Sequence, residues 1–462
     1  MKINPAVASP SALLVKLADR PDFTAVERMP RGADRKAAAW DAIVQTAERS
    51  QAPFLERARQ LERDGIIQSF ETLASPNMLV LTPAPGKTQG VMNAFRTDGV
   101  KAIYGNDGFT LWQQGAAAVP PPRIIGEPNW GLDVVRGAAM RSSAPAERPY
   151  GVDMVGAPAA WAQGATGAGL VFGSIDTGVD YRHEALAANY RGAGGKGRAQ
   201  HDHNWMDLSG ARPSQSPADT KGHGTHTTGT VVGAGVGVAP KAQWIAVNGL
   251  AGTADAALKA LTWMQAPTRL DGSAPDPAKA PDVVGMSWWL GRATQDLFLE
   301  SVQNLRAAGI EPVKSAGNQG PGGGTITSPG QFPELYAVGA VDANGKVATF
   351  SSRGPAPYPK GSTTPKPDFA APGVDVVSSL PNNRYGKNSG TSMAQPHMSG
   401  AVLAVLSKYP ELTHEQLTDA FRAGARDAGK PGTDAEYGAG IIDLPATLAA
   451  AQDILEGARL AA

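Results

Sequence analysis

The sequence contains no cysteine, no long apolar run and no excess of charge of either sign. The lack of cysteine excludes disulfide frameworks, iron–sulfur clusters, cysteine-ligated zinc and thiol nucleophiles. Because Lys+Arg and Asp+Glu are 42 each, no global electrostatic argument favours nucleic acid or a membrane surface as a partner. The first ten residues lack the apolar segment of a signal peptide. We expect neither nucleic acid nor membrane as partners, and either a secreted protein whose signal peptide has been trimmed or a cytoplasmic one.

The length of 462 residues predicts two or three domains. The 55 glycines and 37 prolines predict a turn-rich α/β protein. Residues 11–115 form a unit of their own in this interpretation. A strand at 11–17 precedes a helix at 34–64 that Pro53 interrupts, and two strands, a short helix and a strand follow up to residue 104. The order β-α-β-β-α-β predicts a small α+β domain of the ferredoxin-like kind.

Residues 116–148 are rich in proline, glycine and scattered charge, which is typical of a linker. From residue 149 to 462, apolar runs of strand length alternate with helical segments. This alternation predicts a mostly parallel sheet with helices on both faces. The expected strands are 170–175, 244–247, 283–286, 311–315 and 335–341, and the expected helices include 256–263, 297–308, 401–406 and 444–460.

Three segments of this larger domain carry candidate chemistry. The first is an apolar strand that ends in Asp176-Thr-Gly. The carboxyl ends of strands in an open α/β sheet are where sites are built, so Asp176 is well placed for a catalytic role. The alternative is that Asp176 only caps a turn, because aspartate and glycine are common turn residues.

The second segment, GHGTHTTG, has two histidines three residues apart among small residues. His223 is a candidate general base at the start of a helix, whereas His226 is expected to be a buried structural histidine. A zinc site would need a third ligand, for which His201 or His203 is the alternative candidate.

The third segment, NSGTSMAQPHMSG, leads directly into an apolar helix. Ser392 would then lie at a helix N-terminus, where free N–H groups and the helix dipole stabilise developing negative charge. A nucleophilic serine and a serine that only caps the helix are both consistent with this segment.

Together, the three segments resemble the subtilisin-like serine proteases (peptidase S8 family), whose motifs occur here in that family's order of Asp, His and Ser. The resemblance covers roughly residues 150–450 and includes SAGN, VATFSSRGP and DFAAPG; the segments WMQAPT and KAPDVV are similar to the bacillopeptidase F type.

The resemblance implies a serine endopeptidase that forms an acyl-enzyme. Ser392 would attack a peptide carbonyl in a polypeptide substrate, His223 would transfer the proton, and Asp176 would orient the imidazole. Asn318 matches the asparagine of the oxyanion hole. Residues 11–115 resemble the propeptide of such enzymes, which acts as intramolecular inhibitor and folding aid, with residues 116–148 as linker and processing region. An unrelated accessory domain is the alternative for this unit.

Several positions depart from the family's pattern, and most lie on the substrate side. Where relatives carry Ser-Leu-Gly-Gly or Ser-Trp-Gly-Gly, this chain has Ser287-Trp288-Trp289-Leu290, and Trp289 should disfavour large residues at P1, on the acyl side of the scissile bond. Lys221 is expected near S2 or in solvent, and Lys314 either reaches solvent or lies in the specificity region. The remaining residues expected to line the substrate site are Ser315, Ala316 and Gly317.

No cofactor is required by this interpretation, and the Asn-rich insertion that binds calcium in many subtilisins is missing. Weak calcium binding through Asp202 or Asp207 stays open, and no metal is assigned. Two alternative functions also remain. One is a catalytically impaired relative that acts as a binding or scaffold protein, and the other is an esterase of the α/β-hydrolase kind, whose triad order of Ser, acid and His does not match.

Overall fold

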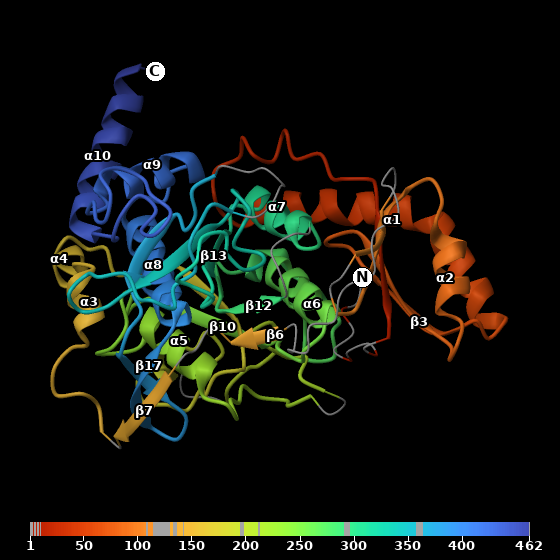
Figure 1. Ribbon diagram of the computed structural model, residues 1–462, viewed down its shortest axis with the longest axis horizontal. Coiled ribbons are helices and arrows are strands. Elements are labelled where there is room, and N and C mark those ends of the chain that lie inside the picture. The colour runs from red at the N-terminus through yellow and green to blue at the C-terminus, as the bar shows by residue number, and fades with distance from the viewer. Residues whose placement is uncertain are drawn as a thin grey trace.

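The computed structural model describes residues 3, 6, 9, 11–107, 110–113, 130–132, 136–141, 143–194, 198–210, 213–290, 296–356 and 364–461. The described chain has a smaller N-terminal unit and a larger domain built around the central helix α8 (Thr391–Lys408) (Figure 1). The N-terminal unit contacts the larger domain through α6 (Ala254–Gln265) and α7 (Leu299–Ala307).

The N-terminal unit is an antiparallel sheet covered by two helices. Its strands lie in the order β2-β3-β1-β4-β5, and the four central pairings are all antiparallel. This arrangement confirms the predicted ferredoxin-like α+β fold, to which β5 adds an edge strand. The elements are β1 (Leu13–Leu17), α1 (Ala33–Arg63), β2 (Ile67–Leu73), β3 (Met78–Pro83), α2 (Thr88–Phe95), β4 (Val100–Gly105) and β5 (Thr110–Gln113).

Helix α1 is continuous through Pro53, so the predicted interruption at that residue was wrong. Proline removes one intrahelical hydrogen bond, which normally kinks or breaks a helix. Here the next residues on the core side, Phe54 and Ala58, are buried against the sheet of the unit. The first half of α1 is buried in other clusters, through Ala39 and Trp40, so we attribute the unbroken helix to packing on both sides of Pro53.

The larger domain contains a seven-stranded sheet in the order β15-β14-β13-β11-β8-β10-β9, and all of its pairings are parallel. Two of the predicted strands match in both bounds, and the sheet confirms the predicted fold class. The strands are β8 (Val171–Asp176), β9 (Trp205–Asp207), β10 (Gln243–Asn248), β11 (Val283–Met286), β13 (Glu311–Ser315), β14 (Tyr336–Val341) and β15 (Phe369–Pro372).

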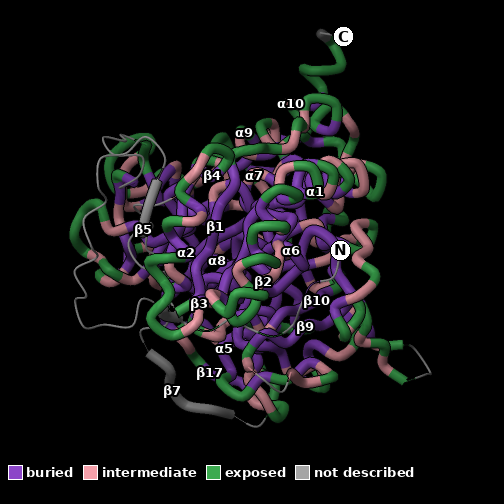
Figure 2. The backbone as a smooth tube through the Cα atoms, turned by 90° about the vertical axis from the view of Figure 1, so that its right-hand side faces the viewer, coloured by how far each residue is buried: buried purple, intermediate pink, exposed green. Residues whose placement is uncertain are grey.

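Helices cover both faces of this sheet. Val283 lies in the apolar cluster that contains α8, whereas its neighbour Val284 lies in the cluster that contains α6 and α7. Successive residues of a strand point to opposite faces, so both faces of β11 are buried. Helices α5 (His223–Val232) and α8 pack against each other, and residues 391–406 of α8 are all buried (Figure 2).

Shorter elements complete the domain. Strand β12 (Trp288–Leu290) pairs with β6 (Trp130–Leu132), and a second small sheet has the order β16-β17-β7. Both β6 and β7 lie within the predicted linker, and each pairs with a strand of the larger domain. The remaining elements are β7 (Arg136–Arg141), α3 (Tyr150–Met154), α4 (Ala157–Ala162), η1 (Ala187–Asn189), η2 (Pro277–Lys279), β16 (Val376–Leu380), β17 (Arg384–Ser389), α9 (His414–Gly424) and α10 (Leu444–Ala461).

The N-terminal unit shares an apolar core with the larger domain. Residues from β1, β3 and β4 lie in the same buried cluster as residues from α6 and α7. Two buried lysines also cross the boundary: Lys36 Nζ donates to Asp282 (2.7 Å) and Lys259 Nζ donates to Glu71 (2.6 Å). Because each buried ammonium faces a carboxylate, the interface tolerates these charges. The two parts therefore form one closely packed structure.

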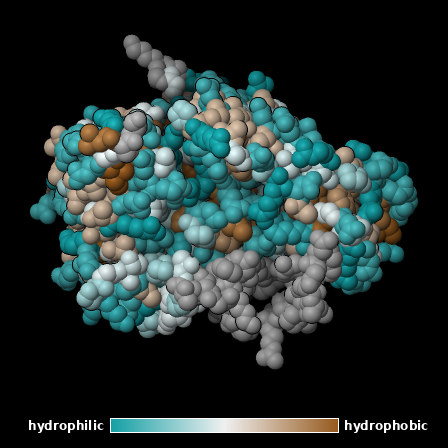
Figure 3. Space-filling model, turned by 90° about the horizontal axis from the view of Figure 1, so that it is seen from above, coloured by the Kyte–Doolittle hydropathy of each residue, from teal (hydrophilic) through white to brown (hydrophobic). Residues whose placement is uncertain are grey.

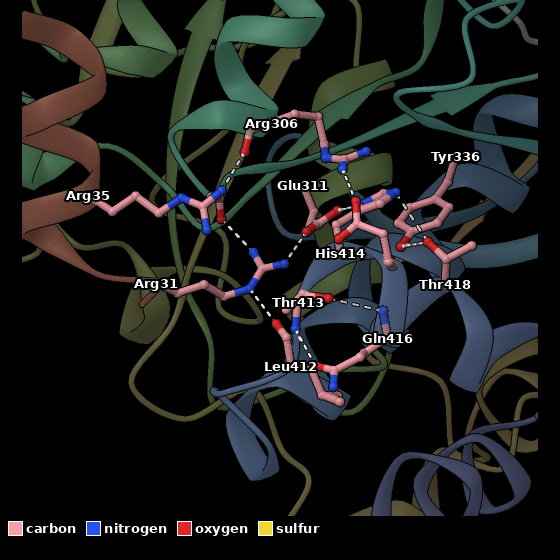
Figure 4. Close-up of polar contacts among 12 residues, drawn as sticks. Arg31, Arg35, Arg306, Glu311, Tyr336, Leu412, Thr413, His414, Gln416 and Thr418 are labelled. Atoms are coloured by element: carbon pink, nitrogen blue, oxygen red, sulfur yellow. Dashed lines mark hydrogen bonds and ion pairs between the residues drawn. The ribbon is translucent and has the colours of Figure 1, made fainter. Parts of the chain in front are cut away.

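A charge cluster at Glu311 adds a further contact between the two parts (Figure 4). Arg31, just before α1, donates to the Glu311 carboxylate, and His414 Nδ1 lies 2.6 Å from the other carboxylate oxygen. Burial raises the pKa of Glu311, but the charges of His414 and Arg31 outweigh it and hold that pKa well below its ordinary value. Glu311 is therefore held as an anion between the N-terminal unit and α9.

The outer surface is mostly hydrophilic in the view of Figure 3, and its hydrophobic residues form small separate patches. Among the side chains that the structure describes, Leu460 near the end of α10 is the exposed large hydrophobic residue. Among the helices that the structure describes, none is both long enough and apolar enough to span a membrane. The extensive apolar surface of both parts is thus buried between them or within them.

Candidate active site

Asp176 is the last residue of β8, at the carboxyl edge of the parallel sheet. Its carboxylate is buried and accepts hydrogen bonds on both oxygens. Oδ1 lies 2.6 Å from His223 Nδ1 and accepts from Thr177 N (2.7 Å), while Oδ2 accepts from Thr227 Oγ1 (3.1 Å). These bonds fix the plane of the carboxylate. Asp176 therefore does more than cap a turn, because it also holds the imidazole of His223.

His223 is the first residue of α5, and a second carboxylate positions the turn before it. Gly222 has φ +85°, a left-handed conformation that favours glycine. Asp219 accepts from Gly222 N (2.7 Å), from Thr177 Oγ1 (2.9 Å) and from Thr225 N (2.9 Å). Burial raises the pKa of Asp219, although its hydrogen bonds oppose this shift. Asp219 thus joins the end of β8 to the start of α5.

The sequence interpretation missed this role of Asp219. The available signal was an aspartate four residues before the first residue of a helix, because side-chain oxygens near the start of a helix commonly accept from its free N–H groups.

The other histidines have separate partners. His226 is fully buried, as expected for a structural residue, and its Nε2 lies 3.1 Å from the Val376 carbonyl oxygen. Burial, with a smaller contribution from His223, lowers its pKa to about 3, so it is neutral near pH 7. His201 contacts the Tyr190 hydroxyl instead (2.9 Å). The zinc alternative therefore gains no support from the placement of these residues.

Ser392 is the second residue of α8, whose N-cap is Gly390. It is fully buried, and its Oγ donates to the Ser287 carbonyl oxygen (3.0 Å). In return, Ser287 Oγ donates to the Ser392 carbonyl oxygen (3.1 Å). The reciprocal contact joins the end of β11 to the start of α8. Because Gly390 is the N-cap, Ser392 does not have that capping role.

Asn318 lies beside Ser392, in the loop after β13. Its Oδ1 accepts from both Thr391 N and Thr391 Oγ1 (2.9 Å each). Its Nδ2 is buried and has no acceptor among the residues that the structure describes. A buried donor without a partner is costly and therefore marks a place where an acceptor is expected. The amide of Asn318 can thus donate to an oxygen that develops negative charge next to Ser392.

Gly317 allows the tight turn of this loop and its close approach to Thr327. It has φ +111°, and an added Cβ would lie 2.6 Å from Thr327 Cγ2. Its N–H donates to Thr391 Oγ1 (3.1 Å). Since Ser315 and Ala316 are fully buried, the whole segment is held tightly between the sheet and α8.

The proposed substrate-side residues differ in exposure. Trp288 is fully buried against Phe298, with ring centroids 5.7 Å apart, whereas Trp289 is half-buried in β12. Gly131 of β6 is the cross-strand neighbour of Trp289. Lys221 is exposed, and its backbone N–H donates to Asp219 (3.0 Å).

The two carboxylates for which weak calcium binding was left open have hydrogen-bond partners within the chain. Asp202 accepts from Leu270 N, and Asp207 accepts from Ser209 N.

Comparison with known proteins identifies the family. The model of the subtilase family, Peptidase S8, matches residues 167–440, which include all four candidate catalytic residues. The chain belongs to the subtilase family. The family expected from the sequence is therefore confirmed, and with it a serine peptidase of the subtilisin-like kind.

The similar region covers different fractions of the individual relatives. Bacillopeptidase F of Bacillus subtilis is 38% identical over 328 residues, covering 66% of this chain but only 22% of that protein. Subtilisin E of the same organism is 34% identical over 306 residues, or 64% of this chain and 70% of its own length. The major intracellular serine protease of B. subtilis is 32% identical over 273 residues, covering 57% of this chain and 76% of the relative.

Proposed function

We propose that this protein is a serine endopeptidase that hydrolyses peptide bonds through an acyl-enzyme intermediate. The observation that carries the proposal is the convergence of three distant segments at one edge of the sheet. Asp176 holds His223 at 2.6 Å, α5 packs against α8, and Ser392 begins α8 beside the Asn318 amide. Helix N-termini and unpaired N–H donors stabilise developing negative charge, which is what acyl transfer requires.

In this mechanism Ser392 Oγ attacks the substrate carbonyl carbon while His223 takes its proton. In the structure the hydroxyl donates to the Ser287 carbonyl oxygen, so this mechanism requires it to turn from that acceptor to the imidazole. Asp176 stabilises the imidazolium, and Asn318 Nδ2 donates to the tetrahedral oxyanion with the Ser392 N–H. His223 then gives its proton to the leaving amine, and a water molecule releases the acyl group by the same steps in reverse.

We further propose that residues 11–115 are a propeptide and that the chain cuts itself between Leu132 and Arg136. Leu132 pairs with Trp288, the residue after Ser287, and Arg136 pairs with Ser389, three residues before Ser392. The two strands β6 and β7 therefore approach the proposed nucleophile from opposite sides. Antiparallel pairing with an enzyme strand is the usual way in which a protease holds an extended peptide.

Self-cleavage of the full chain tests the function. The purified protein is incubated and followed by intact mass at several dilutions, beside Ser392→Ala and a matched serine on the same helix, Ser407→Ala. We expect fragments that end between residues 132 and 136 in the unmodified protein and in Ser407→Ala, and none in Ser392→Ala. Equal cleavage in Ser392→Ala would contradict the proposal. No cleavage of the chain or of an added polypeptide would instead favour the binding or scaffold alternative.

A refolding experiment tests the propeptide role. A parallel sheet has many contacts between distant residues and folds slowly, so a docked unit can lower the folding barrier. Residues 149–462 are refolded from denaturant with and without residues 1–115 supplied separately. We expect activity to recover only in their presence. Equal recovery without them would assign the N-terminal unit to another role.

A further inference from the structure

Strand β6 lies beside β12 and pairs with it in an antiparallel register, in which Gly131 is opposite Trp289 (Figure 1). Strand β12 begins at the residue after Ser287. The carbonyl oxygen of Ser287 accepts from Ser392 Oγ (3.0 Å). A segment of the chain itself is therefore paired, as an extended peptide, with the strand that leads away from the proposed nucleophile.

The register of this pair places the residues of a bound substrate. A substrate that pairs with β12 as β6 does has one residue opposite Ser287, and this residue is P1, because Ser287 contacts Ser392 Oγ. The residue opposite Trp289, two positions upstream in the substrate, is then P3. In the chain itself Gly131 has the P3 position. The cut would follow two residues later in the sequence, after Asp133.

The two tryptophans of β12 face opposite ways. Trp288 is fully buried, and its ring centroid lies 5.7 Å from that of Phe298. Because successive residues of a strand point to opposite faces, the half-buried Trp289 lies on the other face. Residues that are directly opposite in an antiparallel pair share a face and are close neighbours. The indole of Trp289 therefore shares its face with the P3 side chain of a substrate.

A glycine at P3 suits this neighbour. Glycine has no side chain, so its backbone is open to an aromatic ring on the facing strand, and such pairs stabilise antiparallel sheets. A larger P3 side chain would compete with the indole for the same space. Glycine is otherwise a poor strand residue, because it loses more conformational entropy than alanine does. A preference for glycine therefore needs a specific partner, which Trp289 supplies in this register.

We propose that Trp289 gives this peptidase a preference for polypeptides with glycine at P3. The inference rests on the proposed function and names the substrate class of that same site. The P1 residue lies on the same face, diagonally across from Trp289, where an aromatic side chain still reaches its neighbour. The same indole therefore also restricts large residues at P1.

Peptide hydrolysis by the self-processed protein tests the inference. Internally quenched peptides that vary only P3, as Gly, Ala, Val and Leu, are compared by kcat/KM. We expect Gly to exceed Leu by about 10-fold. The ratio should fall to one or below in Trp289→Gly and persist in Trp289→Phe, which keeps an aromatic ring. Trp161→Phe, at a half-buried tryptophan of α4 outside the proposed site, should leave the ratio unchanged.

Cleavage of the chain by itself provides a second test. Gly131→Leu puts a large side chain opposite Trp289 and should slow self-cleavage by about 10-fold. Gly126→Leu, in the same predicted linker, should not slow it. Adding Trp289→Gly to Gly131→Leu should restore the rate, because the large residue then faces a small one. A general loss of stability would not be reversed by a second substitution of this kind.

The outcomes separate this inference from the function on which it rests. Turnover with equal rates for Gly and Leu at P3 in the unmodified protein overturns the glycine preference alone. The same holds if Trp289→Gly folds and keeps the full ratio, or if the double variant stays as slow as Gly131→Leu. If no peptide is cut and the chain does not process itself, both proposals are overturned. The ratio in the unmodified protein is decisive even where Trp289→Gly fails to fold.

Discussion

The proposed catalytic centre and the proposed substrate wall, which comprises residues 287–289 and 315–317, lie at the carboxyl ends of strands of the parallel sheet, yet they are built differently. At the centre, hydrogen bonds from other segments hold the carboxylate of Asp176 and the side-chain oxygen of Asn318, as in the contact of Asp176 with His223 at 2.6 Å. These residues also lie within the part of the chain that matches the subtilase family model. At the proposed substrate wall, the resemblance predicts instead that Trp289 departs from the family's usual pattern.

The difference between the centre and the wall corresponds to the difference between catalysing the reaction and selecting the substrate. Acyl transfer requires a nucleophile, a base and oxyanion donors in one geometry, and small displacements of these groups reduce the rate steeply. Selectivity depends on a few side chains that contact the substrate and can be changed one at a time. We therefore expect substitutions at the centre to lower the rate for all substrates, and substitutions at the wall to change only which substrate is preferred.

The largest effect is expected from Asp176→Asn. The amide keeps the shape of the side chain but favours the wrong imidazole tautomer and no longer stabilises the imidazolium. The corresponding change in a serine protease triad lowers kcat by about 10⁴-fold. The measurement is kcat with a small ester and with a peptide, beside Asp180→Asn as a nearby control. A loss confined to one of the two substrates would contradict a role in the chemistry itself.

Asn318→Ala should give the next largest effect. It removes the Nδ2 donor while the loop remains bonded to α8 through Gly317 N and Thr391 Oγ1. We expect kcat to fall by about 10²–10³-fold with little change in KM, a magnitude taken from measurements on subtilisin itself. Circular dichroism and thermal unfolding should show a folded protein. Unchanged turnover would remove Asn318 from the mechanism.

Much of this fold could be predicted because its signals are local. The strand at Val283–Met286 is a short apolar run between turn residues, which is how a strand buried on both faces appears in a sequence. Asp176, His223 and Ser392 could be found because each follows or begins an apolar element, at the sheet edge where ligands bind.

The remaining features depend on contacts between distant residues, which no local pattern encodes. Pro53 was expected to break α1, but packing of Phe54 overrides the local preference. The role of Asp219 requires the end of β8 and the start of α5 to meet. Strand β6 forms only because β12 lies beside it, and the composition of that segment indicated a linker. That Lys314 is buried and does not reach solvent likewise depends on distant residues, such as the turn near Gly330.

Glu311 is the first residue of β13, at the end of the strand away from the proposed site. A substitution of its partner Arg31 tests whether the stability of the fold can change while catalysis and substrate preference stay the same. Arg31→Ala removes one cation from the buried Glu311 and should lower the free energy of unfolding by about 3 kcal/mol. The exposed-pair control Arg59→Ala should change it by less than about 0.5 kcal/mol. Chemical unfolding at pH 7 measures both. An equal loss in the two variants would contradict the special role of the Glu311 cluster.

The same cluster predicts a direction for pH dependence. Because the folded-state pKa of Glu311 lies below its unfolded value, its contribution is complete above about pH 4.3 and is lost progressively as the pH falls further. Glu311→Gln should remove that part of the acid dependence. Midpoints of unfolding between pH 7 and pH 3 measure it, and parallel curves for Glu311→Gln and the unmodified protein would exclude Glu311 as a cause.

The smallest effect is expected from Trp289→Gly, which restores the family's usual glycine at the wall. Trp289 is half-buried opposite Gly131 in the β12–β6 pair, and we expect its indole to restrict the space for a substrate side chain. Its removal should raise kcat/KM for Phe at P1 relative to Ala by about 10-fold, since added hydrophobic room changes selectivity by factors of this size. Hydrolysis of the small ester should stay the same, because Asp176, His223 and Ser392 are unchanged. If the unmodified protein already prefers Phe over Ala, Trp289 does not restrict the residue at P1.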